Sequence, residues 1–586
     1  MKNFLKYVLA TIVGILVLNV LGFLMILIIV GAASASETPT IYENTVLVAT
    51  FNSPITDRAS DNPFDNLSPD KFNKETGMGL DQILKDIKKA KDDDDISGIF
   101  LRLSAIPSSM ATVEEIRDAL IDFKESGKFI LAHSDSYSQK AYYLASVADK
   151  IYLTPTGDFE FKGLSASVMY YKNALDKYGV DMQVIRHGSY KSAVEPFMTD
   201  KMSDANREQI GAMIGSVWNQ YISEIAEARG ISEETLRSYA DDLSVTFDDM
   251  AVEKGMIDGL RYYDEVLDEI RELTDTDEDD DIEAISLKKY ADVPSDTKKE
   301  ATWDKIAVIY AMGNVVVGDA GEGSIGSDRI AKAIREARRD DKVKAIVLRV
   351  NSGGGSGLAS EVIYREVKLA AEVKPVVASL GDVAASGGYY IVCPADTIVA
   401  SETTLTGSIG VFGLLPNIQE LLQEKIGVNT EVVRTNKFAD IGAPTRPLSA
   451  DERAFLQKYI DDFYVNFVNH VAEGRSLSFE QVDAIGGGRV WSGANAMEIG
   501  LIDVFGGLEK SIEIAAEMAG LENYRITSLP ELEDPLTIIM KQLNGEVKAR
   551  VIRKELGDNY QIYKKIDEIR QMKGVQAVMP YTIDIY

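Results

Sequence analysis

The sequence is poor in the residues on which most metal and thiol chemistry depends. Its 586 residues include one cysteine, Cys393, and three histidines, His133, His187 and His470. A single cysteine cannot form an intrachain disulfide or a multi-cysteine zinc or iron–sulfur site. A histidine cluster is nearly excluded by the same count. We therefore expect no metal site and no cofactor held by such ligands.

Positive charge is also scarce. Lys and Arg number 62 against 92 Asp and Glu, which gives a formal net charge of −30. Such an acidic chain is a poor general binder of nucleic acid, so we expect no nucleic-acid partner. Hydrophobic residues make up 45% and charged residues 26% of the chain, which is a globular composition. Its length is sufficient for several domains.

Long hydrophobic runs are absent except for one near the N-terminus. The uncharged stretch at 7–33 follows Lys2 and Lys6 and precedes Glu37. As a helix it would extend roughly 40 Å, enough to cross a bilayer. The positive-inside rule places residues 1–6 in the cytoplasm and the rest outside the cytoplasmic membrane. We expect a single-pass signal anchor in lipid, although Ala33-Ser34-Ala35 leaves cleavage as the alternative.

The rest of the chain contains one pattern twice. At an offset of 247 residues, Ile99–Leu103 aligns with Ile346–Val350, and Tyr142-Tyr143 aligns with Tyr389-Tyr390. Each copy alternates helical segments with short β-branched strands, which indicates βαβ units and a mostly parallel sheet. The fold class is therefore α/β with a tandem duplication. The expected divisions are a first copy at 45–272, an acidic linker at 273–302, a second copy at 303–521 and a charged tail at 522–586.

Two glycine-rich corners in the second copy are typical of a nucleophile site. Ser386 stands at a strand–turn–helix corner, followed by Gly387 and Gly388. Such a corner exposes a serine oxygen and presents the next backbone N–H to negative charge. An upstream strand ends in Asn351–Ser356, whose glycines let the backbone approach a ligand. Together the two corners can form an oxyanion hole with two donors.

The two copies have lost opposite parts of this site. By the 247 offset, Ser386 corresponds to Gln139, and the glycines at 353–355 correspond to Ile106-Pro107-Ser108. At an offset of 248, Lys191 of the first copy corresponds to Ala439 of the second. One copy therefore keeps the serine and the other keeps a lysine. A duplicated enzyme that builds one site from two halves would show this pattern.

These residues resemble the signal peptide peptidase A family in its long, two-copy, membrane-anchored bacterial form. The resemblance covers the anchor and both copies, about residues 1–521, and its most specific motifs are Tyr190–Phe197, Asn351–Gly355, Ala385–Tyr390 and Thr406–Gly410. It implies a crotonase/Clp-protease-like fold and a serine–lysine protease without a cofactor. It also implies a homo-tetramer that cleaves remnant signal peptides after protein export. Apolar substrate pockets near Ala384 and Ala385 would suit such peptides.

The resemblance assigns a role to each matching position. It makes Ser386 the nucleophile, Lys191 the general base and Ser408 the residue that positions the lysine, with Gly355 and Gly387 as oxyanion donors. One departure is Gly353, where the family usually has proline. The exchange loosens the loop but removes no donor, because proline has no N–H.

Four alternatives remain open from the residues alone. A Ser–His–Asp hydrolase would require His187, which lies four residues before Lys191. A base within the second copy would point to Lys437, two residues from Ala439. A crotonase-type acyl-CoA enzyme shares the fold and the oxyanion hole. An inactive membrane scaffold would keep the doubled fold without chemistry.

Overall fold

The computed structural model describes residues 6–7, 10–18, 21, 39–59, 77–294, 302–532 and 574–579. Most of the expected anchor at 7–33 lies outside the described residues, so the anchor stays a prediction. Within the described ranges, no helix has the length and apolar character needed to cross a membrane.

The first copy is built on a six-stranded parallel sheet. Its strand order is β6-β4-β3-β2-β1-β7, and every neighbouring pair is parallel. The strands are β1 (Thr45–Ala49), β2 (Ile96–Arg102), β3 (Phe129–Tyr137), β4 (Lys150–Phe159), β6 (Gly259–Leu260) and β7 (Ala284–Ser286).

The second copy has a larger sheet of eight strands. The order is β17-β15-β13-β11-β8-β19, with β14 pairing β13 and β18. Only β17 runs antiparallel to its neighbour. The strands are β8 (Lys305–Met312), β11 (Val343–Ser352), β13 (Val376–Ala385), β14 (Thr397–Ala400), β15 (Leu405–Gly407), β17 (Val490–Ser492), β18 (Val504–Phe505) and β19 (Arg525–Leu529).

The repeat seen in the sequence recurs in the elements. Strand β2 and helix α2 (Leu80–Asp92) begin 247 residues before β11 and α12 (Ser327–Arg339). Apolar residues at helical spacing bury one face of each helix, for example Ile83 and Ile87 in α2. The predicted βαβ pattern and the tandem duplication are thus confirmed.

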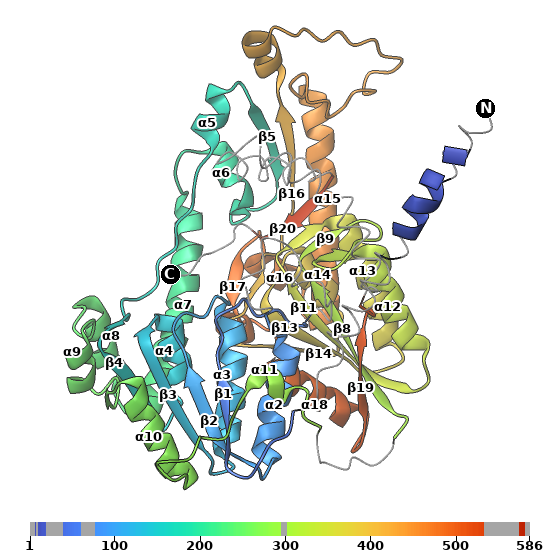
Figure 1. Cartoon of the computed structure of the whole chain (residues 1–586). Coiled ribbons are helices and arrows are strands. Elements are labelled where there is room, and N and C mark those ends of the chain that lie inside the picture. The colour runs from blue at the N-terminus through green and yellow to red at the C-terminus, as the bar shows by residue number, and fades with distance from the viewer. Residues whose placement is uncertain are drawn as a thin grey trace.

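Figure 1 shows the remaining helices around the sheets, except those at 172–177 and 195–198, which lie above the two large sheets. In the first copy they are α3 (Met110–Lys124), α4 (Gln139–Ala145), α5 (Lys172–Lys177), α6 (Glu195–Met198), α7 (Asp204–Arg229), α8 (Glu233–Asp241), α9 (Asp248–Glu253), α10 (Tyr263–Thr274) and α11 (Leu287–Tyr290), with the 3₁₀ turn η1 (Ser192–Val194). In the second copy they are α13 (Gly357–Ala371), α14 (Gly387–Val392), α15 (Ala450–Arg475), α16 (Phe479–Ile485), α17 (Gly493–Glu498) and α18 (Leu508–Met518), with the π turn η2 (Leu421–Ile426).

A third, mixed sheet joins the two copies. Its order is β10-β9-β12-β20-β16-β5. Strand β5 (Asp181–Arg186) belongs to the first copy, yet it pairs antiparallel with β16 (Phe412–Asn417) of the second over six residues. Figure 1 shows this pair rising together above the two large sheets. The other strands are β9 (Asn314–Val316), β10 (Ser324–Gly326), β12 (Gly354–Ser356) and β20 (Gln576–Val578).

The structure differs from the expected divisions at two places. Strand β7 and helix α11 lie in the segment assigned as linker, and β7 pairs with β1. Strands β19 and β20 lie in the segment assigned as tail, and β19 pairs with β8. In each large sheet the added strand covers β1 or β8, which would otherwise present unpaired backbone groups at the sheet edge. Short strands of this kind leave little periodicity in a sequence.

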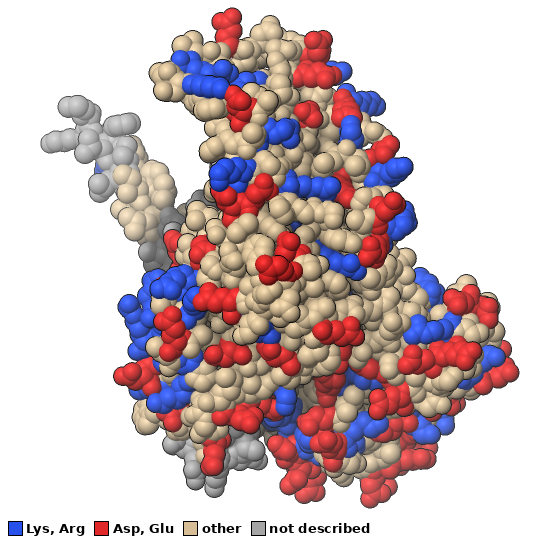
Figure 2. Space-filling view, turned by 180° about the vertical axis from the view of Figure 1, so that it is seen from behind, with Lys and Arg blue, Asp and Glu red and all other residues tan. Residues whose placement is uncertain are grey.

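Buried charge also connects the copies. Arg349 on β11 is fully buried, and its guanidinium contacts Asp57 Oδ1 and Glu115 Oε1 of the first copy, both at 2.6 Å. Charge on the surface is unevenly distributed. On the face in Figure 2, Asp and Glu side chains crowd the lower part, whereas the middle is mostly uncharged. The arginine contacts tie β11 of the second copy to the first copy.

Candidate active site

Ser386 occupies the corner between β13 and α14. Its backbone has φ +56° and ψ −117°, a strained conformation that non-glycine residues rarely adopt. Its N–H donates to the Gly407 carbonyl at 2.8 Å, and its own carbonyl accepts from the Tyr390 N–H at 2.8 Å. These two hydrogen bonds hold the backbone of the turn in its strained conformation. The backbone in turn fixes the direction of the Ser386 side chain.

Lys191 reaches this corner from the first copy. It follows β5, and the pairing of β5 with β16 carries its loop onto the second copy. Its Nζ lies 2.7 Å from Ser386 Oγ, 2.9 Å from Ser408 Oγ and 3.0 Å from the Ser408 carbonyl. The structure thus brings together, within one chain, the three side chains that the sequence singled out.

Burial sets the charge state of the lysine. Lys191, Ser386 and Ser408 all have no solvent exposure. Full burial lowers the pKa of Lys191 well below its usual value, because the charged ammonium is disfavoured away from water. Burial at this position therefore favours the neutral form of the Lys191 amine.

Glycines of the second copy make room for the lysine. A Cβ on Gly488 would lie 2.6 Å from the Lys191 backbone N, and one on Gly410 would lie 3.3 Å from Lys191 Cδ. Gly488 also has φ +89°, which other residues seldom adopt. Sequence reasoning noted Gly410 only as part of a motif and missed Gly488. In the sequence, the run of three glycines at 486–488 is the one feature that could have indicated a close approach of another segment.

Two more side chains support the lysine loop from the first copy: Gln209, which the sequence did not single out, and Glu195, which it gave only within the motif Tyr190–Phe197. Gln209 on α7 donates from Nε2 to the Tyr190 carbonyl at 3.1 Å and to Ser192 Oγ at 2.7 Å. Glu195 Oε1 accepts from Ser203 Oγ at 2.5 Å. Both side chains are buried. They fix the backbone on either side of Lys191.

The two expected oxyanion donors lie close together. Gly355 is on β12, and Gly387 begins α14. A Cβ on Gly387 would lie 3.1 Å from the Gly355 backbone N, so the two corners approach the same point. Gly354, with φ +100°, would place a Cβ 2.7 Å from the Gly387 N. This crowding allows only glycine and presents backbone N–H groups beside Ser386.

The alternative bases lie elsewhere. His187 Nδ1 lies 2.8 Å from Asp461 Oδ1, and its ring stacks on Tyr464 at 3.9 Å between centroids. Lys437 is exposed and forms an ion pair with Asp451. Within the described part of the chain, the Ser386 hydroxyl contacts Lys191 Nζ and the Gly410 carbonyl, and neither His187 nor Lys437. The geometry favours Lys191 over both.

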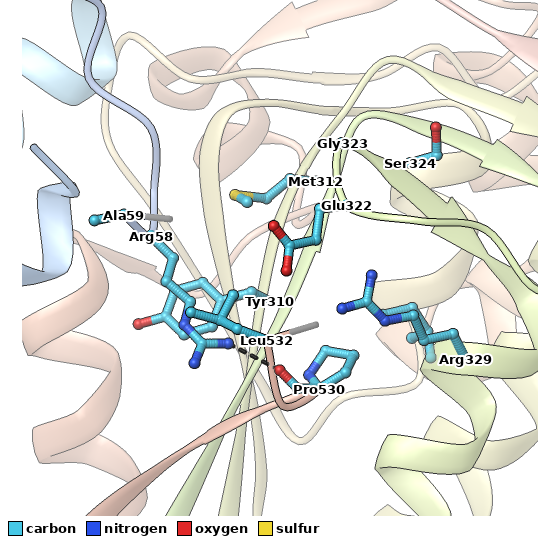
Figure 3. A pocket seen from close by; sticks show the side chains of 11 residues that line it. Arg58, Ala59, Tyr310, Met312, Glu322, Gly323, Ser324, Arg329, Pro530 and Leu532 are labelled. Atoms are coloured by element: carbon cyan, nitrogen blue, oxygen red, sulfur yellow. Dashed lines mark hydrogen bonds between the residues drawn. The ribbon is translucent and has the colours of Figure 1, made fainter. Parts of the chain in front are cut away.

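One further hollow lies between the copies but holds none of the site residues. Arg58, Tyr310, Glu322 and Arg329 line it, and Arg58 donates to the Pro530 carbonyl at 2.8 Å (Figure 3). Its volume is about 70 Å³, which is room for a few water molecules rather than a peptide. Among the residues the structure describes, no group of three His, Cys, Asp or Glu side chains could hold a metal ion.

Fold and site together define a tandem α/β protein in which a buried serine–lysine contact joins the two copies. Comparison with known proteins gives the family. The model for peptidase family S49 matches twice, at residues 122–277 and 368–522. The chain therefore belongs to peptidase family S49, and it is a serine protease of the signal peptide peptidase A type.

Curated relatives agree over most of the chain. Protease 4 of Salmonella typhi is 39% identical, over 80% of this chain and 77% of its own length. The chloroplastic serine protease SPPA of Arabidopsis thaliana is 33% identical, over 87% of this chain and 75% of its own length. A solved structure, a ClpP1 mutant from Listeria monocytogenes, aligns at 14% identity and TM-score 0.23, covering 35% of this chain and 94% of that one. The acyl-CoA enzyme and the inactive scaffold are not favoured by these relatives.

Proposed function

We propose that the chain is a membrane-anchored serine endopeptidase that uses Ser386 as nucleophile and Lys191 as general base to degrade remnant signal peptides. The observation that carries this proposal is the 2.7 Å contact between Lys191 Nζ and Ser386 Oγ in a fully buried environment. Ordinary lysine is protonated at neutral pH and cannot act as a base. Full burial lowers the pKa of Lys191, which favours the neutral amine that a base requires.

The neutral amine matches its surroundings. It has two N–H groups and one lone pair, and three oxygens surround it. Its N–H groups donate to the Ser408 hydroxyl and carbonyl oxygens. The lone pair then accepts the proton of Ser386 Oγ. Ser408 thereby sets the direction of the lone pair, which makes it a positioning residue.

Catalysis follows from this arrangement. Ser386 Oγ attacks the peptide carbonyl as Lys191 takes its proton, and the Gly355 and Gly387 N–H groups bind the developing oxyanion. The ammonium of Lys191 then protonates the leaving amine. In the second half, Lys191 activates water, which hydrolyses the acyl-enzyme ester and frees Ser386.

Apolar lining beside the serine supports an apolar peptide substrate. Ala385 packs in a cluster with Met213, Leu405 and Val490. Signal peptides are apolar segments, so the cluster suits their side chains. The relatives include a chain named as a putative signal peptide peptidase, from Enterococcus faecium, 32% identical over 38% of this chain.

The proposal also includes the setting. Residues 7–33 would anchor the chain in the cytoplasmic membrane, with the catalytic copies on the outer side and four chains in the active assembly. Protease added to intact spheroplasts should then digest the chain beyond about residue 40. Full protection of the bulk of the chain would reverse this orientation.

Fluorophosphonate labelling tests the enzymatic part. The full-length protein should be labelled at Ser386 and should hydrolyse a synthetic signal peptide, whereas Ser386→Ala should do neither. Absence of labelling in the wild-type protein, with the peptide left intact, would contradict a serine peptidase. Labelling that persists in Ser386→Ala would contradict the assignment of the nucleophile.

A further inference from the structure

A bulge in the second sheet lies directly before the two corners of the candidate active site. Strands β11 and β13 pair in parallel, with Val350 opposite Leu380 and then Ser352 opposite Ala384. Between these pairs β13 advances further than β11, so β13 carries a bulge at 381–383. Bulges often lie beside active sites, where they redirect the residues that follow. Here the glycine-rich corner follows on β11 and the serine corner follows on β13.

The bulge decides which residues of the two corners lie side by side. When the register after the bulge is continued, Gly355 is level with Gly387. The register before the bulge would instead place Gly355 level with Ala385. The close approach of a Cβ on Gly387 to the Gly355 N, at 3.1 Å, agrees with the register after the bulge. The two expected oxyanion donors therefore meet because the bulge shifts one strand against the other.

Asn351 on β11 holds the bulge in place. Its Oδ1 accepts from the Val383 N–H at 3.2 Å, and its Nδ2 donates to Asp382 Oδ2 at 3.2 Å. A Cβ on Gly381 would lie 3.0 Å from Asn351 Nδ2, so a larger residue at that position would displace the amide. One side chain on β11 thus lies against all three residues of the bulge.

Two segments of the first copy hold these side chains from the other side. Asn351 Nδ2 also donates to Asp57 Oδ2 at 2.9 Å. Asp382 Oδ1 accepts from the N–H and the hydroxyl of Thr112, both at 2.9 Å. Thr112 lies in the first turn of α3, so a carboxylate of the second copy caps a helix of the first. Asp57 and Thr112 are both buried, which places the bulge inside the contact between the copies.

The corresponding positions of the first copy are built differently. Ser104 stands at the position of Asn351 and lines a cavity at the strand ends. Asp135 stands at the position of Asp382, but it accepts from Thr154 Oγ1 at 2.6 Å within its own copy. The asparagine amide is therefore found in the copy that carries the nucleophile and the glycine-rich corner.

We infer that Asn351 and Asp382 are positioning residues through which the first copy sets the oxyanion hole. This inference rests on the proposed function. The first copy then contributes to both parts of catalysis, because it supplies Lys191 as the base and keeps the two oxyanion donors in register. The oxyanion forms in the transition state, so a loss of register should lower kcat more than it changes KM.

The test exchanges Asn351 for the serine of the first copy and follows fluorophosphonate labelling of the full-length protein against pH. The phosphonate oxygen enters the oxyanion hole, so the maximal rate reports the hole, whereas the apparent pKa of the rate reports Lys191. Asn351→Ser should lower the maximal labelling rate, and kcat for a fluorogenic apolar peptide, by about tenfold to a hundredfold. The apparent pKa and KM should stay close to their wild-type values.

Thr112→Val tests the contribution of the first copy. It keeps the size of the side chain and removes the hydroxyl that donates to Asp382. The maximal labelling rate should fall by about twofold to tenfold, which corresponds to one hydrogen bond. Adding this change to Asn351→Ser should cost little more, because both changes act on one network.

Asn417→Ser is the matched control. Asn417 is also a half-buried asparagine of the second copy, but its Oδ1 accepts from the Gln419 N–H at the end of β16. This variant should be labelled at the wild-type rate. A loss as large as that of Asn351→Ser would overturn the inference, because the effect would not be specific to the bulge.

Other results would also overturn the inference. Asn351→Ser labelled at the wild-type maximal rate would do so and leave the proposed function standing. So would a lower rate whose apparent pKa moves toward the ordinary lysine value, because Asn351 would then act on the lysine loop rather than on the oxyanion hole. Losses that multiply in the double variant would separate Thr112 from the network. Wild-type protein that resists labelling and leaves the peptide intact would instead overturn the proposed function.

Discussion

The same corner of the fold is built in opposite ways in the two copies. In the second copy, Ser386 and the neighbouring glycines leave the ends of β11 and β13 open to a carbonyl. In the first copy the corresponding residues bond to neighbouring loops instead, and Lys140 Nζ donates to the Ser108 carbonyl at 2.8 Å. Gln139, at the position of the serine, accepts from the Lys162 and Gly163 N–H groups at 2.7 and 2.8 Å. In the first copy, hydrogen bonds from Gln139 to a loop therefore stand where the second copy has the Ser386 hydroxyl.

The lysine loop shows the reverse difference. Lys191 is buried against the second copy, whereas Ala439, its counterpart, lies in an exposed turn. The first copy also has a cavity of about 480 Å³ beside Ser104 and Ser138, at the equivalent strand ends. The second copy holds β20 at its own site. The first copy alone therefore lacks the serine, and the second copy alone lacks the lysine.

The largest effect should come from removing the Ser386 hydroxyl, which has no counterpart in the first copy. Ser386→Ala should lower kcat for peptide hydrolysis by several orders of magnitude, since serine proteases lose about 10⁶ when the nucleophile is removed. The fold should persist, because the change removes no core volume. Hydrolysis of a fluorogenic peptide and thermal unfolding measure the two effects.

His187→Ala is the control for that change. It removes the contact with Asp461 but no group at Ser386, so substantial activity should remain. A loss as complete as that of Ser386→Ala would restore the histidine base.

Exchanging the lysine tests the first copy's contribution. Lys191→Ala should be about as inactive as Ser386→Ala, and the double variant should cost little more, because nucleophile and base act as a unit. Lys191→Arg should not restore activity, since a guanidinium stays protonated. Steady-state kcat measures all three variants.

Lys437→Ala is the matched control, because Lys437 lies in the equivalent loop of the second copy and is exposed. It should keep wild-type turnover. Loss of activity in this variant, with Lys191→Ala still active, would place the base within the second copy.

The contact between the copies can be weakened without touching the site. Arg349→Ala leaves Asp57 and Glu115 buried without their partner, which should destabilise the fold by about 3–5 kcal/mol. Urea unfolding followed by circular dichroism measures the loss. Arg335→Ala is the control: its guanidinium is half-exposed and Glu366 keeps Arg338 as a second partner, so the change should cost about 1 kcal/mol or less. Equal losses would show that the buried arginine does not hold the copies together.

Much of this architecture could be predicted from the sequence, but not all of it. The repeat, the serine corner and the absence of a lysine at Ala439 left clear patterns at offsets of 247 and 248 residues. Strands β7, β19 and β20 did not, because three to five residues give too little alternation to stand out. The partners of Arg349 and the fit of Gly488 against Lys191 are contacts between distant segments, and no local pattern encodes them.

A smaller effect concerns stability and pH. The folded protein holds Lys191 with a lowered pKa, so between that pKa and the ordinary value the unfolded chain binds more protons. Stability should therefore rise with pH in this window. Lys191→Met lacks the titrating amine, so its free energy of unfolding should exceed that of the wild type most at the acidic end, and the gap should narrow toward pH 10. A constant gap would mean that the buried amine keeps its proton.

The pH dependence of fluorophosphonate labelling tests the central claim, a site shared between two copies, most directly. The rate at which Ser386 is labelled reports how readily its proton leaves, without substrate binding or product release. The account predicts a rate that rises through a pKa well below the ordinary lysine value of about 10.4, with the rise abolished in Lys191→Ala and unchanged in Lys437→Ala. A rise that survives in Lys191→Ala would contradict it.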